Sequence, residues 1–114
     1  MKTVVITGSA RGLGLEMAKV FKENNVSVII SDLNEDALVK SEEELNKIKS
    51  SSVIKHYVCD VTKTKDIESL IKFAKDEFGK IDIWINNAGV NHVQNTRCTP
   101  TPPGYRRILR YIYV

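Results

Sequence analysis

The chain is 114 residues long, which is enough for one domain with a modest hydrophobic core. It carries 17 basic and 14 acidic residues, and residues 1–90 hold all of the acidic ones and 13 of the basic ones. Residues 91–114 hold four arginines and no acidic residue, so the net charge of +3 comes from this segment and does not indicate nucleic-acid binding by the rest.

Cysteine content and hydropathy exclude several further classes of protein. The two cysteines, Cys59 and Cys98, lie far apart and form neither a disulfide framework nor a zinc-ligand pattern, so no metal site is expected. No apolar run is long enough to cross a membrane, and the N-terminus leads directly into a strand-like segment instead of a targeting signal. The sequence therefore predicts a cytoplasmic protein that binds neither nucleic acid nor a membrane.

Residues 3–14 join an apolar run to three glycines and then to a helical pattern. The segment reads Thr-Val-Val-Ile-Thr-Gly-Ser-Ala-Arg-Gly-Leu-Gly. Gly8 can take the positive φ of a tight turn, Gly12 lets a phosphate approach the backbone, and Gly14 lets the helix pack closely on the strand. The N–H groups at the helix start and the positive end of its dipole favour an anion. A glycine-rich turn can be only a turn, but this position between strand and helix favours a phosphate-binding loop.

The rest of residues 1–90 alternates between strand-like and helix-like segments. Apolar or β-branched runs predict strands, and apolar residues at helical spacing predict the helices between them. Strands are expected at residues 2–7, 26–31, 53–59 and 81–86, with one helix from Leu13 to Asn24–Asn25, one capped by Asn34, and one capped by Thr62 or Thr64 and ended by Gly79. This order predicts βαβ units and a parallel sheet.

Four segments resemble the short-chain dehydrogenase/reductase family in their residues, order and spacing. They are Thr-Gly-Ser-Ala-Arg-Gly-Leu-Gly at residues 7–14, Asp32 after the second strand, Cys59-Asp60-Val61 after the third, and Asn86-Asn87-Ala88-Gly89 after the fourth. The resemblance covers residues 1–90. It implies an α/β fold with a Rossmann-type parallel sheet, βαβαβαβ in the strand order 3-2-1-4, truncated before the family's catalytic half.

The same resemblance implies a cofactor and an activity. The cofactor is NAD(H), and the reaction is hydride transfer between it and an alcohol or carbonyl substrate. The residues that the resemblance assigns to cofactor binding are Gly8, Ser9, Arg11, Gly12, Leu13, Gly14, Asp32, Leu33, Asp60, Val61, Asn87, Ala88 and Gly89.

Asp32 and Arg11 bear on which nicotinamide cofactor is bound. Asp32 lies 18 residues beyond Gly14, near the spacing of about 20 expected for an acid that binds the ribose hydroxyls. A carboxylate there also repels a 2′-phosphate, although an aspartate at this point can serve simply as a turn or cap residue. A basic residue in the family's glycine loop often accompanies NADP, and Arg11 supplies one. Because a nearby carboxylate outweighs a longer and more mobile arginine, NAD is expected over NADP.

Two further segments are interpreted through the resemblance. It assigns the Asp60 carboxylate to the amino group of adenine, whereas the sequence alone is equally consistent with an aspartate that starts the turn before Thr62. In residues 86–89, the small Ala-Gly pair lets the backbone approach the nicotinamide ribose. One of the two asparagines is expected to tie neighbouring strands together, and the other can face the cofactor.

The catalytic residues of the family have no counterpart in this chain. Family members use a Tyr-x-x-x-Lys pair, in which the tyrosine is a general acid and the lysine lowers its pKa. No lysine follows four residues after any of the tyrosines, which are Tyr57, Tyr105, Tyr111 and Tyr113. Residues 91–114 hold all three prolines and are expected to form a divergent tail, disordered or loosely packed, that lacks the family's oligomer interface.

Three functional hypotheses remain open. The first is an NAD-dependent oxidoreductase of this family, represented by its cofactor-binding half. The second is a truncated or frameshifted remnant that is catalytically inactive and at most binds nucleotide. The third is an interaction peptide formed by residues 105–114, where basic and apolar residues alternate. Three other residues, of types that often have functional roles, are expected to be structural. Cys59 and Trp84 are expected in the core, and His56 half-buried in a strand.

Overall fold

The computed structural model describes residues 1–87, and its elements alternate between strand and helix as the sequence predicts. They are β1 (Thr3–Thr7), α1 (Gly12–Glu23), β2 (Ser27–Asp32), α2 (Glu35–Asn46), β3 (Ile54–Val58), α3 (Thr64–Phe78) and β4 (Ile83–Ile85). Ala88, Gly89 and the predicted tail lie outside the described residues.

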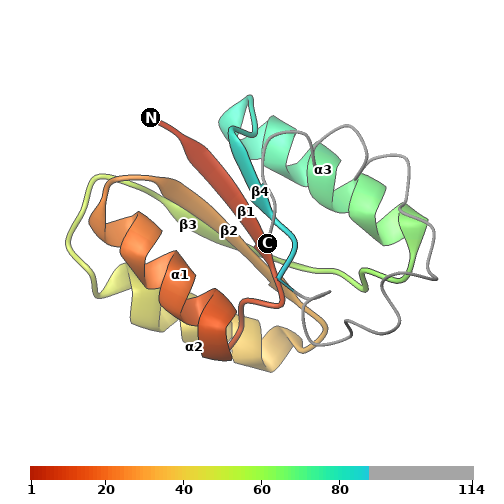
Figure 1. Ribbon diagram of the computed structural model, residues 1–114, viewed down its shortest axis with the longest axis horizontal. Coiled ribbons are helices and arrows are strands. Elements are labelled where there is room, and N and C mark those ends of the chain that lie inside the picture. The colour runs from red at the N-terminus through yellow and green to blue at the C-terminus, as the bar shows by residue number, and fades with distance from the viewer. Residues whose placement is uncertain (88–114) are drawn as a thin grey trace.

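The four strands form one parallel sheet in the order β3-β2-β1-β4, which confirms the Rossmann-type topology (Figure 1). β1 pairs with β2 on one side, with Val5 opposite Ile29, and with β4 on the other, with Val5 opposite Trp84. β3 pairs with the free side of β2. Because every pair is parallel, the carboxyl ends of all four strands lie at one edge of the sheet.

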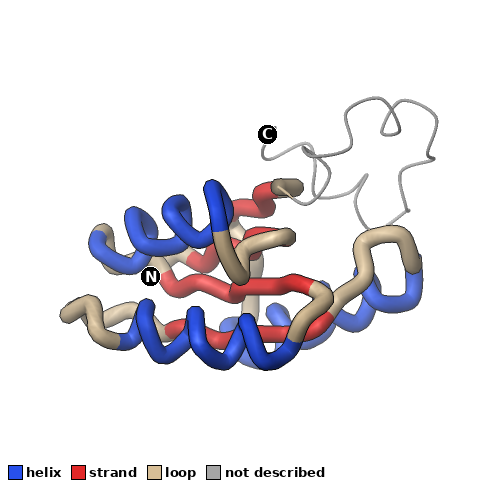
Figure 2. Tube along the Cα trace, turned by 90° about the horizontal axis from the view of Figure 1, so that it is seen from below, coloured by secondary structure: helices blue, strands red, loops and turns tan. Residues whose placement is uncertain are grey.

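Helices cover both faces of this sheet. α1 and α2 lie on one face and α3 lies on the other, so the sheet is the middle layer of three (Figure 2). Val4 and Ile6 pack in the cluster formed with α1 and α2, whereas Val5 between them packs in the cluster formed with α3. All five residues of β1 are buried, as expected for the central strand of a parallel sheet.

The start of α2 follows the sequence prediction, and the start of α3 does not. The Asn34 side chain accepts a hydrogen bond of 3.1 Å from a backbone N–H in the first turn of α2 and caps that helix. The prediction that Thr62 or Thr64 caps α3 is wrong, because Lys63 is the N-cap residue and makes no side-chain capping bond. The Thr62 hydroxyl donates instead to the Asp60 carboxylate at 2.6 Å, which occupies it before the helix begins.

The predictions for the remaining structural residues are confirmed. Trp84 and Cys59 are buried in the cluster against α3. His56 is half-buried on β3, with Nδ1 3.3 Å from a carboxylate oxygen of Glu42 on α2. Gly79 ends α3 in the left-handed conformation, at φ 78°. These residues therefore support the fold and lie outside the candidate site.

Candidate functional site

Four sequence-predicted segments meet at the edge of the sheet where the strands end. The glycine loop follows β1, Asp32 ends β2, Asp60 follows β3 and Asn87 follows β4. The parallel topology therefore brings together residues that are far apart in the chain. In open α/β sheets, ligands bind in the crevice outside these carboxyl ends.

The glycines of the loop have two different structural roles. Gly8 and Gly12 have φ angles of 64° and 65°, in the left-handed region that favours glycine. A Cβ on Gly14 would lie 2.5 Å from the Gly8 carbonyl oxygen and 2.8 Å from Asn87 Nδ2, whereas a Cβ on Gly12 would have no atom within 4 Å. Gly14 thus allows α1 to pack against the loop, and Gly12 leaves open space at the start of the helix.

The side chain of Ser9 is turned into the protein. It is fully buried, donates to the Ile6 carbonyl at 2.7 Å and accepts from the Ser31 N–H at 3.0 Å. The Ser9 N–H also donates to the Ser31 carbonyl at 3.0 Å. The hydroxyl and the backbone N–H of Ser9 therefore both fix the loop to the end of β2, and Ser9 has a structural role in the loop.

Asp32 is held against the glycine loop by its own carboxylate. Oδ2 accepts a hydrogen bond of 3.1 Å from the Ala10 N–H, and Oδ1 accepts one of 2.8 Å from the Leu33 N–H. Each oxygen of an ionised carboxylate has two lone-pair sites, so each keeps acceptor capacity beyond its backbone partner. The two backbone bonds thus fix the carboxylate at the loop and leave it able to accept hydroxyl groups of a ligand.

The start of α1 differs from the starts of the other helices in residues 1–87. α1 has no side-chain cap and no acidic residue in its first turn. α2 is capped by Asn34 and carries Glu35 and Asp36 in its first turn, and α3 carries Asp66 there. The uncompensated N–H groups and dipole of α1 therefore fit a phosphate group next to the loop.

Asp60 starts the turn before Thr62, which was one of the two roles that the sequence is consistent with. Its Oδ1 accepts both the Thr62 N–H at 2.9 Å and the Thr62 hydroxyl at 2.6 Å. These hydrogen bonds from Thr62 hold the pKa of the Asp60 carboxyl below its usual value. Because both bonds use Oδ1, the turn leaves Oδ2 for a ligand, and the turn role and an adenine-binding role are compatible.

The two asparagines after β4 contact the first strand and its loop. Asn87 is buried and its Nδ2 donates to the Gly8 carbonyl at 2.9 Å. The Thr7 hydroxyl lies 3.4 Å from the side-chain oxygen of Asn86. Both side chains therefore connect β4 to β1, and Asn87 also fixes the carbonyl of the tight turn.

The other predicted residues lie around the same edge. Leu13 and Leu33 are 60% and 66% exposed, Arg11 is also exposed, and Val61 is half-buried. Exposed leucines beside a crevice supply apolar contact for a bound ring or ribose. Ala88 and Gly89 lie outside the described residues.

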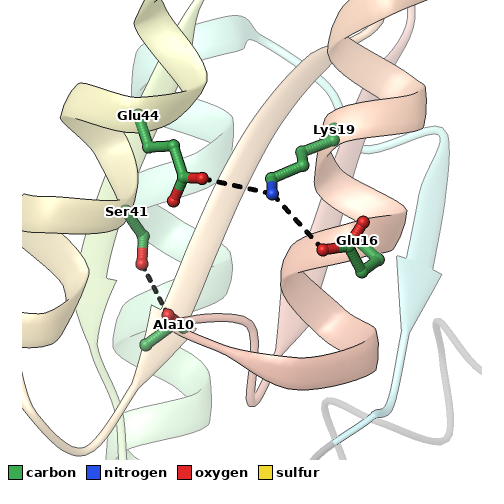
Figure 3. Close-up of polar contacts among 5 residues, drawn as sticks. All are labelled: Ala10, Glu16, Lys19, Ser41 and Glu44. Carbon is green, nitrogen blue, oxygen red and sulfur yellow. Dashed lines mark hydrogen bonds and ion pairs between the residues drawn. The ribbon is translucent and has the colours of Figure 1, made fainter.

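Sequence reasoning missed one residue that contacts the loop, Ser41 on α2. Its hydroxyl donates to the Ala10 carbonyl at 2.5 Å (Figure 3). Ser41 is buried between Leu38 and Leu45 on the inner face of the helix. A single hydroxyl on an otherwise apolar helix face is the signal that could have identified it, because a buried hydroxyl needs a partner.

This geometry agrees with comparisons with known proteins. The family model for short chain dehydrogenases matches residues 2–106, so the chain belongs to that oxidoreductase family, and the match extends beyond residue 90, where the sequence motifs end. A diacetyl reductase ((S)-acetoin forming) of Staphylococcus epidermidis is 39% identical over 92 residues, covering 81% of this chain and 35% of that protein. The chain thus spans about a third or less of the length of its first curated relatives.

Solved structures of the family share the fold and include different cofactors. A hydroxysteroid dehydrogenase from Escherichia coli superposes with a TM-score of 0.70 at 33% identity, covering 75% of this chain and 35% of that one. An NAD⁺-bound xylitol dehydrogenase superposes with a TM-score of 0.68 at 29% identity, covering 73% of this chain and 31% of that one. An alcohol dehydrogenase from Thermococcus sibiricus, complexed with 5-hydroxy-NADP, has a TM-score of 0.68 at 27% identity, covering 74% of this chain and 35% of that one. Both NAD and NADP forms therefore occur among the similar structures.

Two features are absent from residues 1–87. Within this part of the chain, no three His, Cys, Asp or Glu side chains are grouped so that they could hold a metal ion. None of its helices is both long and apolar enough to span a membrane.

Proposed function

We propose that this chain is the NAD(H)-binding part of a short-chain dehydrogenase that transfers hydride between NAD(H) and an alcohol or carbonyl substrate. The observation that carries the proposal is the Asp32 carboxylate, held against the glycine loop by the N–H groups of Ala10 and Leu33. The cofactor, when bound, supplies or accepts the hydride. The residues of this chain bind it and orient it.

The adenosine ribose is proposed to lie against Asp32. Two ribose hydroxyls match the acceptor capacity that remains on the two carboxylate oxygens. A 2′-phosphate in the same place would meet a negative charge at close range, which costs about 1 kcal/mol at 4 Å in water and about 4 kcal/mol near a protein surface. Arg11 is exposed and can attract that phosphate, but the Asp32 carboxylate is fixed and the arginine is not.

The diphosphate is proposed to lie at the start of α1. That helix start has no side-chain cap and no acidic residue in its first turn, and Gly12 presents no Cβ to a ligand. The exposed Leu13 and Leu33 are proposed to flank the ribose and phosphate positions, and Asp60 and Val61 to flank the adenine. Asn87, Ala88 and Gly89 are assigned to the nicotinamide. Nicotinamide binding at residues 86–89 follows from the family resemblance alone.

Calorimetric titration of the 114-residue chain with NADH and NADPH tests the cofactor assignment. We expect the wild type to bind NADH at least tenfold more tightly, which corresponds to about 1.4 kcal/mol. In Asp32→Asn, the preference should fall to about twofold or less, because the charge is lost while a side-chain acceptor remains.

Asp76→Asn is the matched control, since it removes the same charge from an exposed position near the end of α3. That end of the helix leads into β4 and lies away from the carboxyl ends of the strands. The control should keep the wild-type preference. A wild type that prefers NADPH would show that Arg11 dominates, and a chain that binds neither cofactor would refute the proposal.

Binding without catalysis is the second candidate for the 114 residues by themselves. The chain contains no Tyr-x-x-x-Lys pair, and Tyr57 packs its ring against Phe73 with centroids 4.8 Å apart. We expect the purified chain to bind NADH and to show no carbonyl reduction with diacetyl or other small carbonyl compounds. Steady NADH oxidation that depends on such a substrate and co-purifies with the chain would contradict this.

A further inference from the structure

The backbone of Ala10, in the glycine loop, is bound on both sides by the rest of the protein. Its N–H donates to Asp32 Oδ2 at 3.1 Å, and its carbonyl oxygen accepts from Ser41 Oγ at 2.5 Å (Figure 3). Ala10 and Ser41 are only 5% and 4% exposed. Water therefore has little access to replace the hydroxyl as the partner of this carbonyl.

The bond from Ser41 also determines where the next N–H group points. Ala10 and Arg11 are joined by a trans peptide bond, like all peptide bonds in residues 1–87. In a trans peptide, the carbonyl and the N–H point in opposite directions. A carbonyl held on α2 therefore turns the Arg11 N–H away from α2, one residue before α1 begins.

One partly exposed ion pair also connects α2 to α1, but it is a weaker connection. Lys19 on α1 lies 3.2 Å from Glu44 on α2 and 3.3 Å from Glu16 on its own helix (Figure 3). Ion pairs of this kind are screened by solvent and contribute little to stability. The hydrogen bond from Ser41 is buried, and it joins α2 to the backbone of the loop itself.

We propose that Ser41 is a positioning residue of the nucleotide site: by holding the Ala10 carbonyl, it fixes the Ala10–Arg11 peptide in the orientation in which the glycine loop binds the diphosphate. The inference rests on the proposed function, because it assumes that this loop receives a diphosphate. Without the hydroxyl, the buried carbonyl has lost this donor, and leaving it unsatisfied costs free energy. Conformations in which the peptide rotates so that the carbonyl reaches water therefore become more populated. The loop then has to be ordered when the ligand binds, which lowers affinity.

The test compares Ser41→Ala, Ser41→Thr and Ser52→Ala in the 114-residue chain. Ser52→Ala is the control, because it removes another buried serine hydroxyl: Ser52 is 5% exposed, and its hydroxyl donates to the Lys22 carbonyl at 3.5 Å, far from the loop. Dissociation constants are measured for NADH and ADP, melting temperatures for every variant, and amide hydrogen exchange at Arg11 and Gly12 without ligand.

We expect Ser41→Ala to raise both dissociation constants about tenfold and to speed exchange at Arg11 and Gly12. Ser41→Thr should restore binding to within about threefold of wild type, because it keeps the hydroxyl. Ser52→Ala, which also loses a buried hydroxyl, should leave binding within about twofold of wild type. The melting temperatures show that each variant is folded when its binding is compared.

Three results would overturn the inference. They are wild-type binding by Ser41→Ala, an equal loss of binding in Ser52→Ala, and a folded Ser41→Thr that binds as weakly as Ser41→Ala. If the wild type binds neither NADH nor ADP, the proposed function fails and this inference fails with it. If the wild type binds and only the Ser41 variants behave unexpectedly, the positioning role alone is refuted.

Discussion

Gly14 lies so close to Gly8 that a Cβ added to Gly14 would be 2.5 Å from the Gly8 carbonyl oxygen. The same carbonyl accepts a hydrogen bond from Asn87 at 2.9 Å, so the first turn of α1, the tight turn after β1 and the end of β4 meet at one point. The neighbours of the missing Cβ include backbone atoms, which cannot move aside as the end of a flexible side chain can. A glycine is therefore required at this position by packing.

Gly14→Ala is expected to destabilise the protein by about 1–3 kcal/mol, the usual cost of overpacking. Helix propensity alone predicts the opposite sign, since alanine in a helix is favoured over glycine by about 1 kcal/mol. Denaturant unfolding followed by circular dichroism measures the difference. Val20→Ala, at an exposed position of the same helix, is the control and should leave stability unchanged or slightly higher. A Gly14→Ala variant more stable than wild type would contradict the close contact.

The capping residues give a second, paired prediction. Asn34→Ala should lower the free energy of unfolding by about 1 kcal/mol, because the side chain caps α2. Thr64→Ala should change it by less than about 0.5 kcal/mol, since Lys63 occupies the cap position of α3 and Thr64 is exposed. Both variants can be measured in the same unfolding experiment. Equal losses in the two variants would show that Thr64 also caps its helix.

The sequence predicted the order and type of all seven elements in residues 1–87, because apolar or β-branched runs alternate with apolar patterns of period 3.6, and glycines and asparagines mark several of the boundaries. Strand ends were less predictable. β4 was expected at residues 81–86 and covers Ile83–Ile85. Apolar residues indicate which segment is buried, but the strand extends only as far as β4 pairs with β1. That pairing depends on the neighbouring strand, which the local sequence of β4 does not reveal.

The sequence identified the residues at the candidate site better than it identified what each side chain contacts. Glycine spacing and the strand ends located the loop, Asp32 and Asp60. The Ser9 hydroxyl accepts from the Ser31 N–H because β2 lies beside the loop, and the Ser41 hydroxyl reaches the Ala10 carbonyl because α2 packs against the loop. Those contacts join residues that are far apart in the chain, so no local pattern encodes them.

Cys59 gives a prediction on pH dependence. Burial, reinforced by the negative charge of Asp66, raises the pKa of the Cys59 thiol from 9.0 to about 11. The folded state therefore disfavours the thiolate, and the contribution to stability is fully present below pH 9 and is lost as the pH rises toward 11.

The free energy of unfolding of the wild type should consequently fall relative to that of Cys59→Ala by about 2 kcal/mol between pH 8 and pH 10.5. Subtracting the variant removes the titration of lysines, which both proteins share. The packing cost of the substitution is independent of pH and cancels in the same comparison. A difference that stays constant over this range would mean that the thiol titrates normally in the folded protein.

The last prediction concerns the boundary between residues 1–90 and residues 91–114, which we propose as the end of the cofactor-binding unit. Within residues 1–87, β4 pairs only with β1, so its other side is the edge of the described sheet. A chain ending at Val90 should melt at the same temperature as the 114-residue chain if the later residues do not pack on the unit. A fall of about 4–8 °C would correspond to about 1 kcal/mol for a domain of this size.

A chain ending at Gly104 then separates the proline-containing segment from residues 105–114. If the loss appears only when residues 105–114 are removed, those residues stabilise the unit, as a strand added beside β4 would, and the proposed boundary is wrong.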